Sequence, residues 1–544
     1  MKRLALFLTF TTACIFAGAQ QFVVIKTQEG QEVIPVEDIE CITLEQDADF
    51  HARLLPRAIA ADERTQLFGQ ALQVTGWADS LLDFVDADYV SLLDNLDEWS
   101  HIISVWHTMS IMPRFPQARL KCFSAFVETD SVFAAHGIMD LSSLTAYAHQ
   151  VYDEIFPSDA VISDPTHPHN ALNRFVAYHL LNFGCSDTTL TADPAYFVRD
   201  VADVSDWYQT LLPGGTVKVS RPDGTEAGLY LNRRGVQDSP DKYGVKIRGA
   251  KIIPSPSGIL TQKVSNGAYF YIDDLLLFGR QTQQEVLNDR WTVDFVTLSP
   301  DFMNNDTRLQ HQFDWNKMAF STIFLPGTVA GFDSPKPTDF CVSPYWYNIN
   351  YYGGESISVG SVDGTPIDIT VTLPVLPQGE WEIRFGCAVS PFLVGLRFSI
   401  DETGLQDSLE ISQQLYRSLD SLYFSWMKQL TPEEEIVFNK QLRSAGWMRG
   451  PKTYSFSTQQ NSQPVRTPEN SKTLYDSGVG GLRRIIGRVH SDGKRPFHLR
   501  IESYEYDEVY DEKGHINQHI RPHDLDFLEF CPSWIVDNEE IPEE

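Results

Sequence analysis

Residues 122–133 carry a strand pattern that runs without a break into the start of a helix. From Phe123 to Glu128, two sets of side chains alternate at the two-residue period of an extended strand. Thr129 then stands where a helix N-cap belongs, and Asp130 and Ser131 suit the first helical turn. This junction of strand and helix is a fold signature, and it does not indicate an active site.

Two further motifs follow at wide spacing. The pair Tyr178-His179 comes first, and residues 266–276 then read Asn-Gly-Ala-Tyr-Phe-Tyr-Ile-Asp-Asp-Leu-Leu. Together with residues 122–133, they resemble the conserved boxes of fasciclin domains, in which Phe-Thr-Val-Phe-Ala-Pro-Thr precedes a Tyr-His pair and a closing Asn-Gly-Val-Ile-His-Val-Ile-Asp box. The resemblance implies one fasciclin-like α+β domain over residues 64–280, whose length implies inserted loops.

The chain departs from the fasciclin pattern at three positions. Glu128 stands where the family has Pro, Phe270 where it has His, and Phe278 where it has a terminal Pro. A role tied to one of those positions in the family is therefore not implied for this chain. We expect a single fasciclin-like copy, because neither a second pair of boxes nor an internal repeat is visible.

The charge balance limits the classes of partner. The chain of 544 residues has 43 basic and 73 acidic side chains, and its formal net charge is -30. Such a surplus of negative charge repels phosphate backbones and anionic membrane surfaces, so we expect no nucleic-acid partner. An apolar fraction of 42%, with 12% aromatic residues, is ample for packed cores in two or three domains.

Residues 1–19 have the pattern of a secretory signal peptide, with a basic start, the apolar run Leu4 to Phe10, and Ala17-Gly18-Ala19 before Gln20. We therefore expect an exported protein in a periplasmic, cell-surface or extracellular location. The alternative is a lipoprotein attached through Cys14, although the aliphatic residue of a lipobox is missing. No later stretch reaches the ~18 consecutive apolar residues of a transmembrane span, so membrane attachment is expected only if the chain is lipidated.

Residues 20–50 predict a short β lead-in module. The runs Phe22 to Ile25, Gln31 to Ile34 and Ile39 to Leu44 are short and strand-like, with turn residues between them. They indicate a β-hairpin followed by a third strand.

Two capped helices and one hairpin are predicted within the fasciclin-like region. Apolar residues recur at helical spacing after Asp140, which is the expected N-cap of the first helix. A second helix is expected to begin after Asn170, to carry His179 on its apolar face and to end at Gly184. Asn266-Gly267 lies between two strand-like runs and predicts a two-residue hairpin turn.

After this region the pattern changes to short strands. We expect a mostly β, jelly-roll-like sandwich over residues 285–535, with a helical insertion at about residues 405–450 and an acidic tail over residues 536–544. Inside the insertion, residues 431–434 form a capping box and Gly446 marks the helix stop. The expected strands are Trp291 to Leu298, Phe320 to Leu325, Ile367 to Leu373, Trp381 to Phe385, Leu396 to Ile400, Leu482 to Val489 and Phe497 to Tyr504.

The motifs of common enzyme classes are missing. The chain has no Gly-x-Ser-x-Gly elbow, P-loop, Rossmann glycine fingerprint or His-Glu-x-x-His helix. We therefore expect a protein that is not an enzyme, and we assign no catalytic residue and no cofactor. A carbohydrate-active enzyme is the alternative, since a glycosidase needs only two carboxylates placed by the fold. The scattered cysteines favour buried side chains over structural zinc, with one or two disulfides as an alternative in an oxidising compartment.

Two histidine pairs are weighed as metal ligands, and neither is assigned. His167 and His169 share a Pro-rich loop with Asp164, and His515 and His519 lie near acidic residues. Both sets are explained as well by solvated loops, because the spacing of a zinc site is missing.

The pair Tyr178-His179 has a structural and a functional interpretation. The Tyr-His neighbourhood has been linked to adhesion in some fasciclin proteins. A histidine on the apolar stripe of a helix is more often a core residue that bonds to the backbone, and we favour that role for His179.

The richest aromatic cluster is the expected binding site. Flat rings beside amide side chains suit stacking on sugars and contacts with proteins, although such rings also fill sandwich cores. The predicted binding residues are Trp346, Tyr347, Tyr351 and Tyr352.

These observations favour an exported cell-surface protein that mediates adhesion or binds an extracellular protein or glycan. The alternatives are a carbohydrate-active enzyme with carboxylates in the sandwich, and a structural subunit of a surface assembly.

Overall fold

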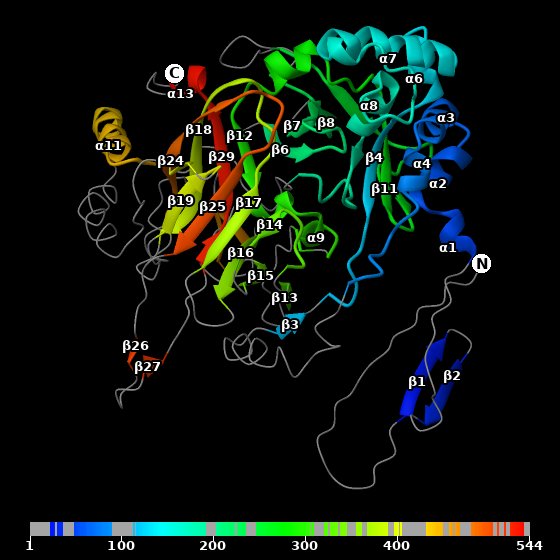
Figure 1. Ribbon diagram of the computed structural model, residues 1–544. Helices are drawn as coiled ribbons and strands as arrows, with labels where there is room; N and C mark the ends of the chain where they lie inside the picture. Colours follow the sequence, from blue (N-terminus) through cyan, green and yellow to red (C-terminus); the bar gives the residue numbers. More distant parts are fainter. Residues whose placement is uncertain are drawn as a thin grey trace. The chain divides into compact units, whose positions relative to one another are not determined.

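The structure is a computed structural model (Figure 1). The residues that it describes are 22–27, 30–35, 48–89, 112–114, 116–191, 203–222, 226–235, 246–305, 307–308, 320–324, 327–335, 338–344, 355–361, 367–389, 396–401, 403–404, 431–449, 456–460, 463–467, 480–503, 509–510, 516–517 and 523–537. The chain divides into two compact units, Met1–Ala52 and Arg53–Glu544. It is a mixed α/β protein with mostly sheet content, and its sheets are curled.

The first unit contains an antiparallel hairpin of β1 (Phe22–Thr27) and β2 (Gly30–Pro35), followed by α1 (Ala48–Ala52). The hairpin confirms the first two strands of the predicted lead-in module. The run Ile39 to Leu44, the expected third strand, lies outside the described residues, as does the predicted signal peptide.

The first half of the second unit has helices and one curled sheet of eight strands. The sheet order is β5-β4-β11-β9-β8-β7-β6, and β10 pairs with β11. The helices are α2 (Leu55–Ala61), α3 (Gln66–Val74), α4 (Trp77–Ser80), α6 (Asp130–Ala135), α7 (Leu141–Ile155) and α8 (Ala171–Tyr178). The strands are β4 (Phe123–Glu128), β5 (Leu180–Leu181), β6 (Asp203–Gln209), β7 (Thr216–Pro222), β8 (Tyr230–Leu231), β9 (Ala250–Ile253), β10 (Gln262–Val264) and β11 (Gly267–Ile272).

Strand β4 and helix α6 confirm the strand-to-helix junction. The strand ends at Glu128, Thr129 is the extended N-cap residue, and the helix begins at Asp130. Five of the six residues of β4 are buried, so both faces of the strand are covered. The cause is its central position, since β5 and β11 flank it and helices pack nearby.

The two predicted helix caps are present. Asp140 accepts a hydrogen bond from the Ser143 amide at 2.8 Å, and the Asn170 side chain accepts one from the Leu172 amide at 2.9 Å. The second helix is shorter than predicted, because it ends at Tyr178 instead of Gly184. The chain leaves the helix early to form β5, whose two residues pair with β4.

The Asn-Gly box lies at the tightest backbone contact of this sheet. The hairpin turn between β10 and β11 is confirmed one residue earlier than expected, with Ser265 and Asn266 in the loop and Gly267 opposite Val264. Gly267 has a φ of 138°, and a Cβ atom there would lie 1.8 Å from the carbonyl oxygen of Phe123. Only glycine fits this position.

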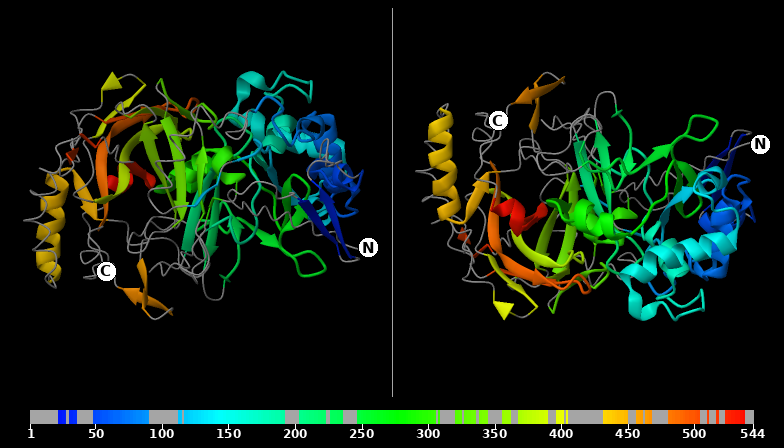
Figure 2. Two further views of the ribbon diagram at one scale, coloured as in Figure 1. Left: turned by 90° about the horizontal axis from the view of Figure 1, so that it is seen from below. Right: turned by 90° about the horizontal axis from the view of Figure 1, so that it is seen from above.

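The second half of the unit consists of three five-stranded sheets (Figure 2). The first contains β12 (Trp291–Asp294), β29 (Phe527–Pro532), β18 (Gly379–Val389), β24 (Gly480–Ser491) and β21 (Trp447–Arg449). The second contains β28 (His523–Leu525), β16 (Glu355–Ser361), β15 (Thr338–Pro344), β13 (Phe320–Phe324) and β3 (Met112–Arg114). The third contains β14 (Phe332–Asp333), β17 (Asp368–Thr372), β25 (His498–Ser503), β19 (Leu396–Ile400) and β20 (Thr403–Gly404).

Shorter elements complete the described chain. They are the 3-10 turns η3 (Pro157–Asp159) and η6 (Phe295–Leu298), the π-helix η5 (Thr282–Val286), the helices α9 (Pro300–Met303), α11 (Pro432–Ser444) and α13 (Ser533–Val536), and the hairpins β22–β23 (Phe456–Gln460, Gln463–Thr467) and β26–β27 (Val509–Tyr510, Ile516–Asn517).

All seven predicted strands of this half are present; β19 has the predicted ends, and the ends of the other six differ. The first stops at Asp294, because its side chain caps the 3-10 turn η6 through the Val296 amide at 2.9 Å. Helix α11 begins at Pro432 inside the predicted capping box, and Gly446 follows its end with a φ of 80°. Residues 405–430 of the predicted insertion lie outside the described ranges.

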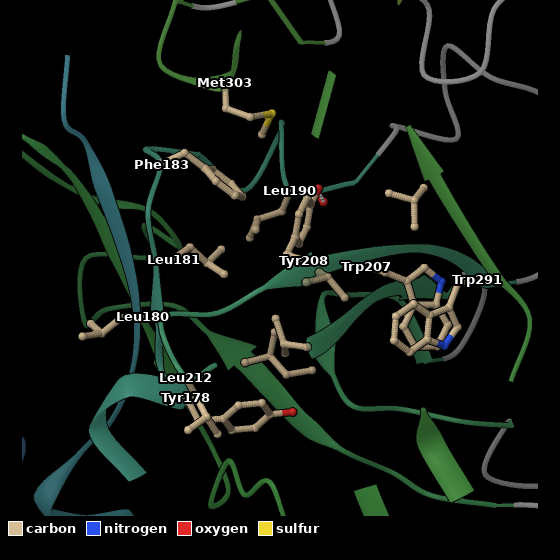
Figure 3. Packing of buried hydrophobic residues seen from close by; sticks show 14 of the residues in the cluster. Tyr178, Leu180, Leu181, Phe183, Leu190, Trp207, Tyr208, Leu212, Trp291 and Met303 are labelled. Atoms are coloured by element: carbon tan, nitrogen blue, oxygen red, sulfur yellow. Dashed lines mark hydrogen bonds between the residues drawn. The ribbon is translucent and has the colours of Figure 1, made fainter. Parts of the chain in front are cut away.

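One continuous cluster of buried apolar side chains runs through both halves of the second unit. At their boundary, the indole rings of Trp207 in β6 and Trp291 in β12 stack with centroids 4.9 Å apart (Figure 3). Arg119 makes a two-point ion pair with Asp301 at 2.8 and 2.9 Å. Segment β3, which comes early in the chain, pairs with β13 of the second half. The two halves therefore pack as one body.

Gly267→Ala is expected to lower the free energy of unfolding by at least about 3 kcal/mol, because the added Cβ meets the Phe123 backbone at the centre of the sheet. Urea denaturation followed by tryptophan fluorescence measures this loss. The matched control is Gly258→Ala, since Gly258 also has a positive φ of 81° but no neighbour within 4 Å of the point that a Cβ atom would occupy. Equal losses in the two variants would contradict the contact argument.

Candidate functional site

The three motif segments meet at one place in the fold. Strands β4 and β11 run parallel, with Phe126 opposite Phe270, and the Phe123 amide donates to the Asn266 carbonyl at 2.9 Å. The carbonyl of His179 accepts a hydrogen bond from the Phe126 amide at 3.0 Å. Segments far apart in the sequence thus form one hydrogen-bonded centre.

A histidine–glutamate pair is buried at this centre. His179 Nε2 lies 2.9 Å from Glu128 Oε1, and both side chains are fully buried. The same carboxylate oxygen accepts the Leu276 amide at 3.0 Å, so all three motifs contribute to it. His179 Nδ1 lies 2.7 Å from the carbonyl oxygen of Phe175. Because a carbonyl only accepts, Nδ1 is the donor of this bond, and Nε2 is the ring nitrogen that faces Glu128.

Tyr178 is also a core residue. Its hydroxyl donates to the Thr216 carbonyl at 2.9 Å and accepts from Asn232 Nδ2 at 2.9 Å. Burial raises the pKa of the Tyr178 hydroxyl well above its ordinary value, although the Asn232 hydrogen bond opposes this. The prediction that Tyr178 and His179 lie inward is confirmed. Helix α8 ends between them, so His179 is its C-cap residue and not a residue of its interior.

A polar cluster at the edge of this core reaches the surface, and we call Asp62, Arg64, Tyr269 and Tyr271 the tyrosine cluster. Arg64 bonds to the Asp62 carboxylate through Nε and Nη2, both at 3.1 Å, and its side chain is 38% exposed. Tyr269 donates to Asp62 at 3.1 Å, and the Tyr271 hydroxyl also bonds to Asp62 and to Arg64. The cluster ties the link between α2 and α3 to β11.

The electrostatics of the tyrosine cluster follow from these contacts. Burial alone would raise the pKa of Asp62, but the hydrogen bonds from Arg64 and Tyr271 outweigh burial and lower it. Burial and the neighbouring Asp62 carboxylate raise the pKa of Tyr271. The cluster therefore presents a guanidinium and two neutral phenols beside an ionised carboxylate.

The carboxylates in the core of the second half are held by arginines. Arg384 bonds to Glu382 at 2.8 Å and to Glu529 at 2.7 Å, and Arg483 bonds to Glu529 at 2.6 Å. Glu382 and Glu529 are 3% and 0% exposed. Each carboxylate is thus buried against a cationic partner and does not face an open cleft.

The predicted binding residues Trp346, Tyr347, Tyr351 and Tyr352 lie outside the described residues. Their segment connects β15 to β16, two antiparallel strands that pair up to Pro344 opposite Glu355. Both ends of the segment are therefore anchored by the sheet.

The histidines weighed as metal ligands are not gathered into a site within the described ranges, where no group of three His, Cys, Asp or Glu side chains could hold an ion. The amide of His169 donates to His167 Nδ1 at 3.1 Å, and Asp164 accepts from the Thr166 amide at 2.9 Å. These bonds belong to a loop. His515 and His519 fall outside the described chain.

No helix of the described segments has both the length and the apolar character needed to cross a membrane.

Sequence reasoning missed two of the groups that organise this region. Glu128 stands out in the sequence only as a departure from the fasciclin pattern, yet it is the acceptor at the centre of the motifs. Asp62 and Arg64 lie ahead of the first motif and carry no signal of their own. A glutamate inside an apolar strand is the available clue, since a buried carboxylate needs a partner.

His179→Ala is expected to lower the free energy of unfolding by about 1 to 3 kcal/mol, since it removes a buried hydrogen-bonded side chain and leaves Glu128 without its partner. Thermal and urea denaturation measure this. His149→Ala is the matched control, because His149 lies on the surface of α7 beside Asp153 at 3.0 Å. A core role is ruled out if His179→Ala keeps the melting temperature of the unmodified chain while abolishing ligand binding.

Asp62→Asn is expected to remove an acid-sensitive part of the stability. Because the folded-state pKa of Asp62 lies below its ordinary value of 3.8, its carboxylate contributes stability above that pH, and this is lost as the pH falls through the lowered pKa. The difference in stability between the unmodified chain and Asp62→Asn should therefore shrink on acidification from neutral pH. Tyr269→Phe keeps the carboxylate and should keep the acid dependence. Parallel pH curves for the unmodified chain and Asp62→Asn would contradict the assignment.

Similarity between this chain and known proteins is slight. No protein-family model matches it, and no curated protein matches it. Among solved structures, the insecticidal crystal protein Cry2Aa aligns with 74% of this chain and 69% of its own, at 9% identity and a TM-score of 0.17. A likeness at that TM-score carries no argument about fold or function.

Proposed function

We propose that the chain is an exported cell-surface protein that mediates adhesion or binds an extracellular protein or glycan. In this proposal, a fasciclin-like domain precedes a jelly-roll-like β-sandwich, and binding, not catalysis, is the activity. The signal-like residues 1–19 support export.

One observation carries the proposal. The three segments that resemble fasciclin boxes come together around Glu128, which is hydrogen-bonded to His179 and accepts from the Leu276 amide. Motifs that matched by chance would have no reason to share a hydrogen-bonded centre. Their convergence supports a fasciclin-like domain, and with it the adhesive or ligand-binding role that the resemblance implies.

The arrangement of carboxylates favours binding over the enzyme alternative. A glycosidase needs two carboxyl groups that reach the substrate about 5 to 9 Å apart. Glu382 and Glu529 are instead buried against arginines. The other alternative, a structural subunit of a surface assembly, predicts self-association without a ligand.

The aromatic segment between β15 and β16 is the proposed contact for a glycan. Because Pro344 pairs with Glu355, the segment starts and ends at one place on a rigid sheet. A segment held at both ends loses less freedom on binding than a free chain. Aromatic rings can stack on sugar faces, and the segment also contains Asn348 and Asn350, whose amide groups are of the kind that bonds to hydroxyl groups.

The test is a glycan and matrix-protein array probed with the purified chain from Gln20 onward. We expect a saturable ligand, and Trp346→Ala should weaken glycan binding about fivefold or more while the melting temperature stays unchanged, since one stacked ring contributes about 1 kcal/mol or more. Trp77→Ala, in α4 of the other half, is the control and should bind normally. Hydrolysis of a polysaccharide, or an array without any ligand, would overturn the proposal.

A further inference from the structure

We infer that Cys122 and Cys185, which are both free thiols in the structure, form a disulfide on oxidation that joins the start of β4 to the chain after β5. Cys122 directly precedes β4, two residues before Ser124, so the extended backbone places their side chains on one face. The Sγ atom of Cys185 lies 3.1 Å from Ser124 Oγ, and the Cys185 amide lies 3.0 Å from the same oxygen. Both cysteines therefore border Ser124.

Gly184 shows how closely the two segments approach. A Cβ atom placed on Gly184 would lie 3.1 Å from the Cβ and 4.0 Å from the Sγ of Cys122. Disulfide-bonded residues have Cβ atoms about 3.5 to 4.5 Å apart and Cα atoms less than about 7 Å apart. Cys185 is the next residue along the chain, so its Cα lies about 3.8 Å from that of Gly184. The approach at Gly184 thus places the residue that precedes Cys185 directly against Cys122.

The pairing of neighbouring strands holds this geometry in place. Ser124 lies opposite Leu181, and its hydroxyl donates to the Phe183 carbonyl at 2.8 Å, which fixes the chain as it leaves β5. Burial raises the pKa of the Cys185 thiol to about 12, although the Ser124 hydrogen bond opposes this. A thiol of this kind reacts slowly once folded.

Oxidation of the two thiols requires a second disulfide that accepts their electrons and protons. The two thiols lose two protons and two electrons as their sulfurs bond, and the disulfide of a thiol–disulfide oxidoreductase, or oxidised glutathione in the test, accepts both and becomes two thiols. In the cell this step rests on the export proposed above, since exported proteins meet oxidising conditions. Oxidation of the purified chain tests the pairing without export.

The experiment refolds the full chain with oxidised glutathione, alkylates it in denaturant and digests it without reduction. Mass spectrometry should find a peptide that links Cys122 to Cys185 and disappears with dithiothreitol. In Cys122→Ser the thiol of Cys185 should become alkylated, and the converse should hold for Cys185→Ser. Cys341→Ala is the control and should keep the link. Alkylation of both cysteines in the oxidised chain, or a link to a different cysteine, would overturn the inference.

Stability gives a second readout. If the two residues are bonded, each single variant and the double variant should lose the same several degrees of melting temperature, because the first substitution already breaks the bond. Dithiothreitol should lower the melting temperature of the unmodified chain to that level and leave the variants unchanged. Additive losses that dithiothreitol does not reproduce would contradict the bond. If the array shows no ligand but the linked peptide is found, the proposed function is wrong and the disulfide inference stands.

Discussion

The parallel pairing of β4 with β11 is the constraint on which the surrounding structure depends. It requires a backbone approach at Phe123 that only glycine permits, and Gly267 supplies it. The pairing also brings Glu128 beside Leu276, where the carboxylate accepts a backbone amide and meets His179. A parallel pair needs a long crossover, and the helices α6 to α8 lie within this one. The position of Gly267 and the buried pair therefore both follow from one strand contact.

The buried Glu128–His179 pair shows how a glutamate is accommodated inside an apolar strand. A carboxylate without partners costs several kcal/mol inside a core, and here an imidazole and an amide at Oε1 offset part of that cost, while the buried Oε2 has no hydrogen-bond partner among the described residues. The same solution recurs in the second half, where Arg384 lies between Glu382 and Glu529. In both halves, buried charged side chains therefore bond to residues of neighbouring segments, and these bonds are part of the fold.

Local patterns predict local structure well in this chain. The junction at Thr129, the caps Asp140 and Asn170, and the strands of the second half depend on residues close in sequence, which a periodic pattern reveals. The predicted helix α8 is too long, because Leu180 pairs in β5 with Ala125, a residue far away in the sequence. The joining of the halves through Trp207 and Trp291 likewise depends on tertiary contact and leaves no local signal.

The candidate binding surface is less predictable than the fold for a physical reason. Alternation in the sequence shows which face of a strand is apolar. It does not show whether a second layer covers the other face, and in β4 both faces are covered. If the aromatic segment after Pro344 were a strand, half of its rings would point inward. The described residues on either side of it, Pro344 and Glu355, pair with each other at the ends of β15 and β16. Segments that link two strands carry recognition more often than the strands themselves. Pairing at its ends, and not its composition alone, is what makes this segment a candidate.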